Sequence, residues 1–209
     1  MGKRFLILAA ICLVITVSIL GQKKTEPQLF SVNLIKNGGA ETGESRDWTN
    51  STELKTFRYD GGWGDAWQVT PTSHGDSYFH ASVSKAIPKL EFSQNFDLSK
   101  IAAEIDANKV DYYLSGWFGV RDFSGARLKT AFYGIDGKQI QEDSTEKFSS
   151  ENRPDDVTFV QKSRGGIVPA GTRKVKVTLE FYIFENADKE EGLAAFADNL
   201  SLVLTEKEK

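Results

Sequence analysis

Residues 174–184 alternate between apolar and polar side chains. Val175, Val177, Leu179, Phe181 and Ile183 occupy every second position, and lysine, threonine, glutamate and tyrosine stand between them. A period of two is the pattern of a β-strand with one face buried and the other in water. The segment therefore predicts a half-buried strand of an antiparallel sheet.

Other parts of the chain repeat this pattern over shorter lengths. A turn at Asp136-Gly137 predicts a hairpin, because glycine accepts positive φ at little cost. Only residues 99–106 resemble a helix, with Ser99 as a candidate cap and with Ile101 and Ile105 on one face. The remaining predicted strands cover residues 78–83, 112–118, 127–133, 138–141 and 157–162.

Many short strands separated by turns indicate an all-β fold, an antiparallel β-sandwich. A parallel α/β architecture is disfavoured because no series of long helices alternates with the strands.

Two related motifs stand at the ends of the strand-rich region. Residues 33–41 read NLIKNGGAE, and residues 196–204 read FADNLSLVL. Each combines a strand with one carboxylate, Glu41 or Asp198, beside Asn or Gly residues that favour turns. We expect the two motifs to meet as the first and last strands of one domain.

The N-terminus has the pattern of an export signal, with Lys3 and Arg4 before an apolar run. The run is slightly long for a cleaved signal and slightly short for a membrane span, so a secreted and an anchored protein both remain open. The single cysteine, Cys12, lies in this run, which leaves no disulfide for the exported part. The expected organisation is a signal peptide or anchor at 1–21, a linker at 22–31, the sandwich domain at 32–204 and a charged tail at 205–209.

Charge argues against nucleic acid as a partner. The chain has 26 Lys+Arg and 29 Asp+Glu, a formal net charge of −3. Phosphate binding needs a concentrated basic face, which this sequence lacks.

Five short motifs follow one another along the chain: residues 33–41 with the following Trp48, 92–99, 114–117, 168–173 and 197–202. In this order they resemble galactose-binding-like jelly-roll domains, which include several carbohydrate-binding module families. They also resemble exported bacterial domains of this fold with no settled function. The likeness covers roughly residues 32–204 and implies a jelly-roll sandwich.

The resemblance implies a structural calcium ion where the first and last strands meet. Glu41 and Asp198 occupy the matching positions, and the turn at residues 37–39 offers carbonyl oxygens, which suit calcium. In the alternative interpretation, both carboxylates accept hydrogen bonds from nearby backbone amides.

A glycine-rich loop at residues 59–67 is the candidate ligand site. Tyr59, Trp63 and Trp67 supply rings that can stack on sugar C–H faces, and Asp65 supplies a hydroxyl acceptor. The alternative is that these rings pack in the sandwich, as we expect for Trp48 and Trp117.

No catalytic motif is evident, so we do not expect an enzyme. His74 and His80 lie near no serine-nucleophile motif, and the exported part has no cysteine. The sequence predicts an exported, non-catalytic binding module whose ligand is a glycan or polysaccharide. The alternative is a secreted or cell-surface domain that binds a protein partner and has no sugar affinity.

Overall fold

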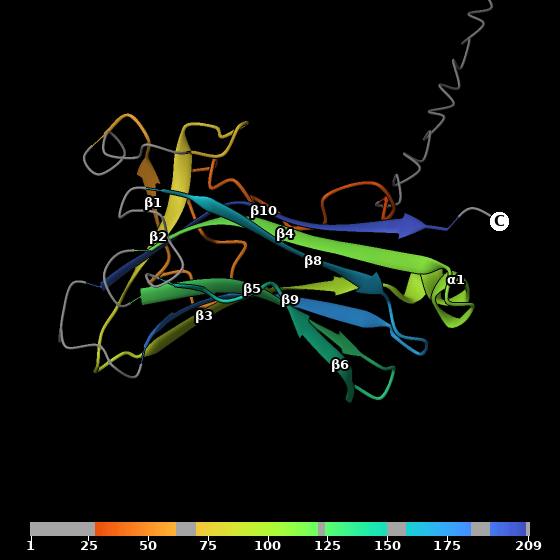
Figure 1. The fold of residues 1–209 in the computed structure, drawn as a ribbon. Coiled ribbons are helices and arrows are strands. Elements are labelled where there is room, and N and C mark those ends of the chain that lie inside the picture. Colours follow the sequence, from red (N-terminus) through yellow and green to blue (C-terminus); the bar gives the residue numbers. More distant parts are fainter. Residues whose placement is uncertain (1–27, 62–69, 121–123, 150–157, 185–192, 208–209) are drawn as a thin grey trace, which may run out of the picture.

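Two antiparallel sheets face each other as the layers of a β-sandwich (Figure 1). The structure is a computed structural model, and it describes residues 28–61, 70–120, 124–149, 158–184 and 193–207. The predicted antiparallel sandwich is confirmed.

The first sheet has the strand order β1-β2-β10-β4-β8. Its strand bounds are Lys55–Arg58 for β1, Ser77–Val83 for β2, Leu193–Glu206 for β10, Val110–Val120 for β4 and Val160–Ile167 for β8.

The second sheet has the order β3-β9-β5-β6, and the short β7 also pairs with β5. Its bounds are Lys89–Asp97 for β3, Lys174–Ile183 for β9, Ser124–Tyr133 for β5, Gln139–Ser144 for β6 and Phe148–Ser149 for β7. A 3₁₀ turn, η2 (Ser99–Ile101), and the helix α1 (Ala102–Asp106) connect β3 to β4 at one end of the sandwich.

Strand β9, an inner strand of the second sheet, is the strand that the alternating pattern predicted. Val175, Val177, Leu179 and Phe181 are fully buried in the core between the sheets. Successive side chains of a strand point to opposite faces, so the intervening polar residues lie on the outer face of the second sheet. This other face is not fully in water as expected, because Thr178, Glu180 and Tyr182 are also buried. Burial of large apolar side chains on one face of each sheet is the main source of stability here.

The turns and the helix follow the sequence with one correction. Gly137 has φ +76° in the hairpin between β5 and β6, and Ile101 and Ile105 are buried on one face, as expected. Ser99 is not the helix cap, because its side chain makes no capping bond. Instead the Asp97 carboxylate accepts a hydrogen bond from the Ser99 backbone N–H (2.9 Å).

The two sheets are also linked at the side of the sandwich where β8 and β6 form their edges. Tyr112 of β4 donates a hydrogen bond to Asp143 Oδ2 of β6 (2.6 Å). Arg164 of β8 donates to the same oxygen (2.8 Å). One carboxylate therefore joins strands of both sheets.

The outer edge of β3 is covered by an earlier turn of the chain. Thr49 exchanges backbone and side-chain hydrogen bonds with Ser93, and Asn50 donates to the Glu91 carbonyl (3.1 Å). Edge strands left open invite pairing with other chains, so this cover protects one side of the second sheet.

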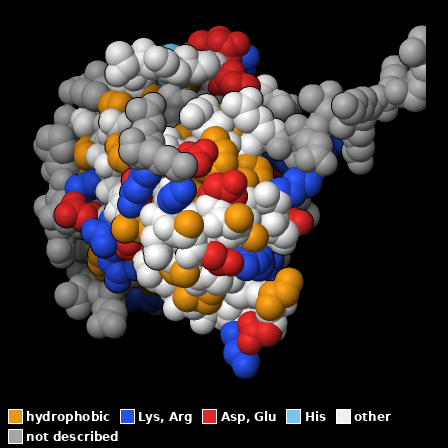
Figure 2. Space-filling view, turned by 90° about the vertical axis from the view of Figure 1, so that its right-hand side faces the viewer, with side chains coloured by type: hydrophobic (Ala, Val, Ile, Leu, Met, Phe, Trp, Pro, Cys, Tyr) orange, Lys and Arg blue, Asp and Glu red, His pale blue; other side chains and the backbone are white. Residues whose placement is uncertain are grey.

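The end of the molecule that carries α1 has a mixed surface, on which basic and acidic side chains alternate with scattered apolar ones (Figure 2). Within the described ranges, no helix is both long and apolar enough to cross a bilayer. The predicted signal or anchor at 1–21 lies outside the described residues. Strand β10 continues to Glu206, which places two residues of the expected tail in the sheet.

Candidate functional site

The two terminal motifs meet, as the sequence predicted. Residues 33–41 do not form the predicted first strand, because they make turns and only an isolated bridge to β10. Phe30 and Asn33 form β-bridges with Leu204 and Val203. The Asn33 amide donates to the Leu200 carbonyl (2.9 Å) and accepts from the Leu202 N–H (3.0 Å). These contacts hold the first segment beside the second half of β10.

Gly38 sits where only glycine fits. Its carbonyl accepts a hydrogen bond from Leu200 N–H (2.9 Å), and a Cβ at Gly38 would lie 2.1 Å from the Leu200 carbonyl oxygen. This close approach of two backbones brings the Gly39–Glu41 turn next to Asp198 and Asn199.

Glu41 binds the start of β2. Its two carboxylate oxygens accept hydrogen bonds from the backbone N–H groups of Asp76 (2.8 Å) and Ser77 (3.0 Å). Gly75 allows this approach, because a Cβ there would lie 2.1 Å from the Glu41 carboxyl carbon. Glu41 thus ties the N-terminal turn to β2.

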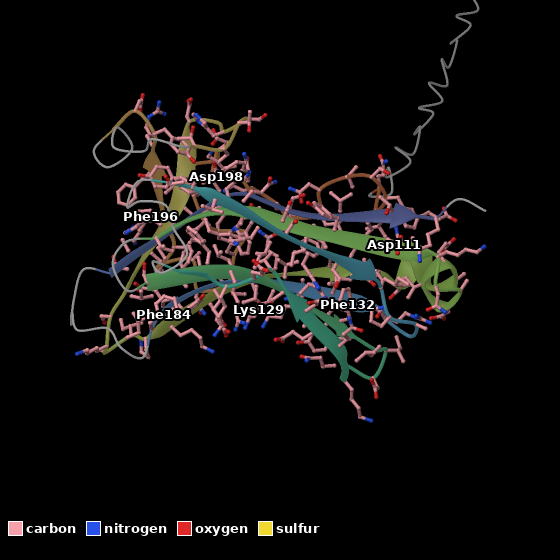
Figure 3. All side chains as sticks on the ribbon, in the orientation of Figure 1. Asp111, Lys129, Phe132, Phe184, Phe196 and Asp198 are labelled. Carbon is pink, nitrogen blue, oxygen red and sulfur yellow. The ribbon has the colours of Figure 1, made fainter. Side chains whose placement is uncertain are left out.

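Asp198 is a fully buried carboxylate at an irregularity in β10. The pairing of β10 with β4 shifts register between Asp198 and Ser201, and Asn199 adopts φ 48°. Asp198 Oδ2 accepts from the Tyr59 hydroxyl (2.8 Å), and Oδ1 accepts from Asn199 N–H (2.6 Å). Figure 3 shows Asp198 in the upper sheet.

Burial raises the pKa of Asp198 to about 7, and the charge of Glu41 acts in the same direction. The hydrogen bonds from Tyr59 and Asn199 oppose this rise but do not cancel it. Burial and the neighbouring Asp198 charge also raise the pKa of the Tyr59 hydroxyl, which stays protonated. The junction therefore holds a carboxyl group that changes charge near neutral pH.

The hydrogen bonds of these carboxylates agree with the alternative interpretation, in which they accept from nearby backbone amides. All four oxygens of Glu41 and Asp198 accept from protein donors, which are three backbone N–H groups and the Tyr59 hydroxyl. Calcium takes six to eight oxygen ligands. Among the described residues, no group of three or more His, Cys, Asp or Glu side chains is arranged to hold a metal ion. Calcium at this junction stays a prediction.

Tyr59 belongs to a small apolar cluster on the outer face of the first sheet. Its ring packs 4.8 Å from Tyr78, 6.0 Å from Phe159 and 4.3 Å from His74, measured between centroids. Trp117 packs against the same cluster and is only partly buried, whereas Trp48 is in the main core as expected. Packing and the bond to Asp198 thus account for Tyr59.

The other three predicted ligand residues, Trp63, Asp65 and Trp67, lie outside the described residues.

A second candidate surface, which the sequence did not indicate, is the outer face of the second sheet. Glu180 is buried there, and accepts from Arg127 Nε (2.6 Å) and Lys129 Nζ (2.8 Å). Lys129 also bonds Glu91 (2.8 Å), whose pKa it holds at about 2. Figure 3 shows Lys129 in the lower sheet, away from Asp198 in the upper one. Only the strand register could reveal this network, since its members come from three strands.

A hollow of about 410 Å³ lies at one end of this outer face. Asn95, Asp97 and Lys174 supply polar groups, and Ile135 supplies an apolar wall. Tyr133 stands next to it, with the Lys174 ammonium 4.7 Å from the ring centroid. The hollow therefore combines an amide, a carboxylate, an ammonium and an apolar side chain, with the Tyr133 ring beside it.

The two histidines do not form a catalytic pair. His74 stacks on Tyr59, and His80 packs between Phe57 (4.8 Å) and Phe196 (5.2 Å). Burial lowers the pKa of His80 to about 4, so its ring is neutral at physiological pH.

Comparisons with known proteins identify the fold. No protein-family model matches the sequence, and no curated protein matches it significantly. The enzymatically active domain of tailspike protein 4 from bacteriophage CBA120 matches with a TM-score of 0.53 and 18% identity. The match covers 83% of this chain but only 21% of the tailspike chain.

Carbohydrate-binding modules also match, with lower TM-scores. The CBM22-1 xylan-binding domain of Paenibacillus barcinonensis Xyn10C gives a TM-score of 0.43 and 13% identity, over 87% of this chain and all of that domain. A CBM4 structure gives 0.42 and 11%, over 82% of this chain and 99% of that one. The β-sandwich that the predicted resemblance implied is the fold of this chain.

Proposed function

We propose that this protein is a non-catalytic binding module whose ligand is a carbohydrate. The observation that supports this most is the hollow at the end of the second sheet's outer face. Sugars need hydroxyl partners and an apolar or aromatic contact for their C–H faces, and the hollow with Tyr133 offers both.

Ion pairing favours binding over chemistry at this surface. Two acidic groups of the face, Glu91 and Glu180, are bonded to Lys129, and Arg127 also bonds Glu180. Glu91 is a poor general acid, because its pKa is lowered rather than raised toward neutrality. We therefore propose that the face binds its ligand and does not transform it.

The loop at residues 59–67 remains the other proposed contact. Tyr59 anchors the start of this loop through its bond to Asp198 (2.8 Å). We propose that Trp63, Asp65 and Trp67 contact the sugar from there.

Affinity electrophoresis in gels that contain soluble polysaccharides tests the function and separates the two surfaces. We expect retardation of the wild type by at least one polysaccharide. Tyr133→Ala reports on the hollow, and Trp63→Ala and Trp67→Ala report on the loop. Loss of retardation in one set assigns the surface. If no polysaccharide retards the wild type, carbohydrate binding is refuted.

A protein-binding role is the second candidate. The hairpin between β5 and β6 extends away from the sandwich (Figure 1), and Ile135 at its tip is 86% exposed. Ile140 of the same hairpin is also exposed, at 45%, so the hairpin presents two apolar side chains to a partner. Binding to a purified partner that Ile135→Ser abolishes, by a wild type that no polysaccharide retards, would favour this role.

Export is also part of the proposal. The basic start and apolar run of residues 1–21 support it. Cell fractionation with N-terminal sequencing of the recovered protein distinguishes a cleaved signal from an anchor. Recovery only from the cytoplasm, with residue 1 intact, would refute export.

A further inference from the structure

Two lysines of β9 lie on the outer face of the second sheet beside the hollow. Lys174 and Lys176 flank Val175, which is buried in the core, so both side chains point outward. In the ladder, Lys174 lies between Asp97 of β3 and Tyr133 of β5. Lys176 lies between Asn95 and Ala131 in the same way.

These two lysines differ from the other cations of the face. Lys89, Arg127 and Lys129 each form an ion pair with Glu91 or Glu180. Within the described part of the chain, neither Lys174 nor Lys176 has a carboxylate oxygen within ion-pair distance. The Lys174 ammonium instead lies over the Tyr133 ring, 4.7 Å from its centroid. The buried carboxylate of Glu180 is thus paired with Arg127 and Lys129, and the two ammonium groups of Lys174 and Lys176 have no ion-pair partner among the described residues.

The nearby acids form no ion pair with these two lysines among the described residues. The pKa of Asp97 is lowered by hydrogen bonds from the Ser99 side chain and the Ser99 N–H (2.9 Å), with a smaller effect of Lys100. Glu142 of β6 lies opposite Ala131 and is separated from Lys176 by that strand position.

The hollow of about 410 Å³, which Lys174 lines, gives a sugar ring room beside the two lysines. The Asn95 side chain is exposed and can both donate to and accept from hydroxyl groups.

We propose that Lys174 and Lys176 form an anion subsite, and that the ligand is an anionic carbohydrate whose carboxylate or sulfate group lies between the two ammonium groups. This inference rests on the proposed carbohydrate binding and adds the charge of the ligand. The chain as a whole is negative, with a formal charge of −3, so the subsite acts by local contact and not by overall attraction.

Affinity electrophoresis of the full chain in a mild non-ionic detergent tests the subsite. The gels contain polygalacturonate as a uronate source, dextran sulfate as a sulfate source, xylan as a neutral sugar polymer, or poly-L-glutamate as an anion without sugar. We expect polygalacturonate or dextran sulfate to retard the wild type more than xylan and poly-L-glutamate. The retardation should fall with added salt, because salt screens exposed charge pairs.

The variant Lys174→Gln/Lys176→Gln removes the two charges and keeps the length of both side chains. We expect its dissociation constant for the anionic polymer to rise about tenfold, as two partly exposed ion contacts are lost. The control Lys36→Gln/Lys85→Gln removes the same charge from exposed lysines elsewhere and should bind as the wild type does. Equal melting temperatures show that both variants fold.

The outcomes separate this inference from the proposed function. Lysine-dependent binding to polygalacturonate alone assigns a uronate, and lysine-dependent binding to dextran sulfate alone assigns a sulfated sugar. Stronger binding to xylan, or unchanged binding of the lysine variant, overturns the anion subsite and keeps carbohydrate binding. Equal binding to poly-L-glutamate also overturns it, because the charge alone then suffices. Absence of binding to any of the three polysaccharides refutes both.

Discussion

The stability of this protein should depend on pH through Asp198, and Asp198→Asn should remove that dependence. Burial raises the pKa of Asp198 from its ordinary value of 3.8 to about 7. Between these two values the native state holds a proton that the unfolded state releases, so stability falls as pH rises. Each pKa unit corresponds to about 1.4 kcal/mol, so the loss is about 4 kcal/mol in total.

Asparagine has the shape of the protonated acid and does not titrate. It keeps one oxygen for the Asn199 N–H, and its amide can donate to the Tyr59 hydroxyl oxygen. The difference in the free energy of unfolding between Asp198→Asn and the wild type should therefore grow by about 4 kcal/mol from about pH 4 to about pH 8.

Urea unfolding followed by tryptophan fluorescence measures this difference at a series of pH values. Asp111→Asn, which removes a more exposed carboxylate paired with Lys207, is the matched control and should show little change. Tyr59→Phe keeps the packed ring and removes the hydroxyl whose bond lowers the pKa of Asp198. That variant should steepen the loss of stability with pH. A difference for Asp198→Asn that stays constant within about 1 kcal/mol across the range would refute the reasoning.

Three further predictions follow from other contacts. Burial lowers the pKa of His80 from 6.5 to about 4, so the unfolded state binds a proton more readily and stability falls as pH drops from 6.5 toward 4. The loss is up to about 3 kcal/mol, and His80→Phe should abolish it in unfolding curves measured at acid pH. Glu180→Ala should lower the free energy of unfolding by about 3 kcal/mol, because it leaves two cations without their buried partner. Lys138→Ala, which breaks an exposed pair, should cost less than about 1 kcal/mol by the same urea assay, and equal losses in the two variants would contradict the role of burial. If calcium binds at the terminal junction, added calcium should raise the melting temperature and a chelator should lower it, with no response in Glu41→Gln; a wild type indifferent to both would remove calcium from the account.

Much of the fold was predictable because its signals are local. The alternation in residues 174–184 predicted β9 almost to its observed bounds, since period-two burial needs no knowledge of partner strands. The turn at Gly137 was predictable for the same reason, as its positive φ depends on one residue. The predicted strand at 157–162 is observed as β8 from Val160 to Ile167, because pairing with β4 and not local pattern sets its end.

The candidate sites were less accessible to sequence reasoning. Glu41 and Asp198 were predicted to share a junction, but their hydrogen-bond donors come from β2 and from the loop at Tyr59, which only the fold brings near. Glu180 and Lys129 have no distinguishing motif. They form a network because register places β3, β5 and β9 side by side, and register depends on pairing between distant segments.

The position of β10 has a consequence for the order in which this protein folds. β10 lies between β2 and β4 in the first sheet, although it is the last strand of the described chain to be synthesised. Without β10 the strands β2 and β4 are not joined in one sheet, and Phe30 and Asn33 lose their β-bridges. The first sheet therefore cannot form completely until residues 193–206 have been synthesised. Pairing between such distant segments slows folding.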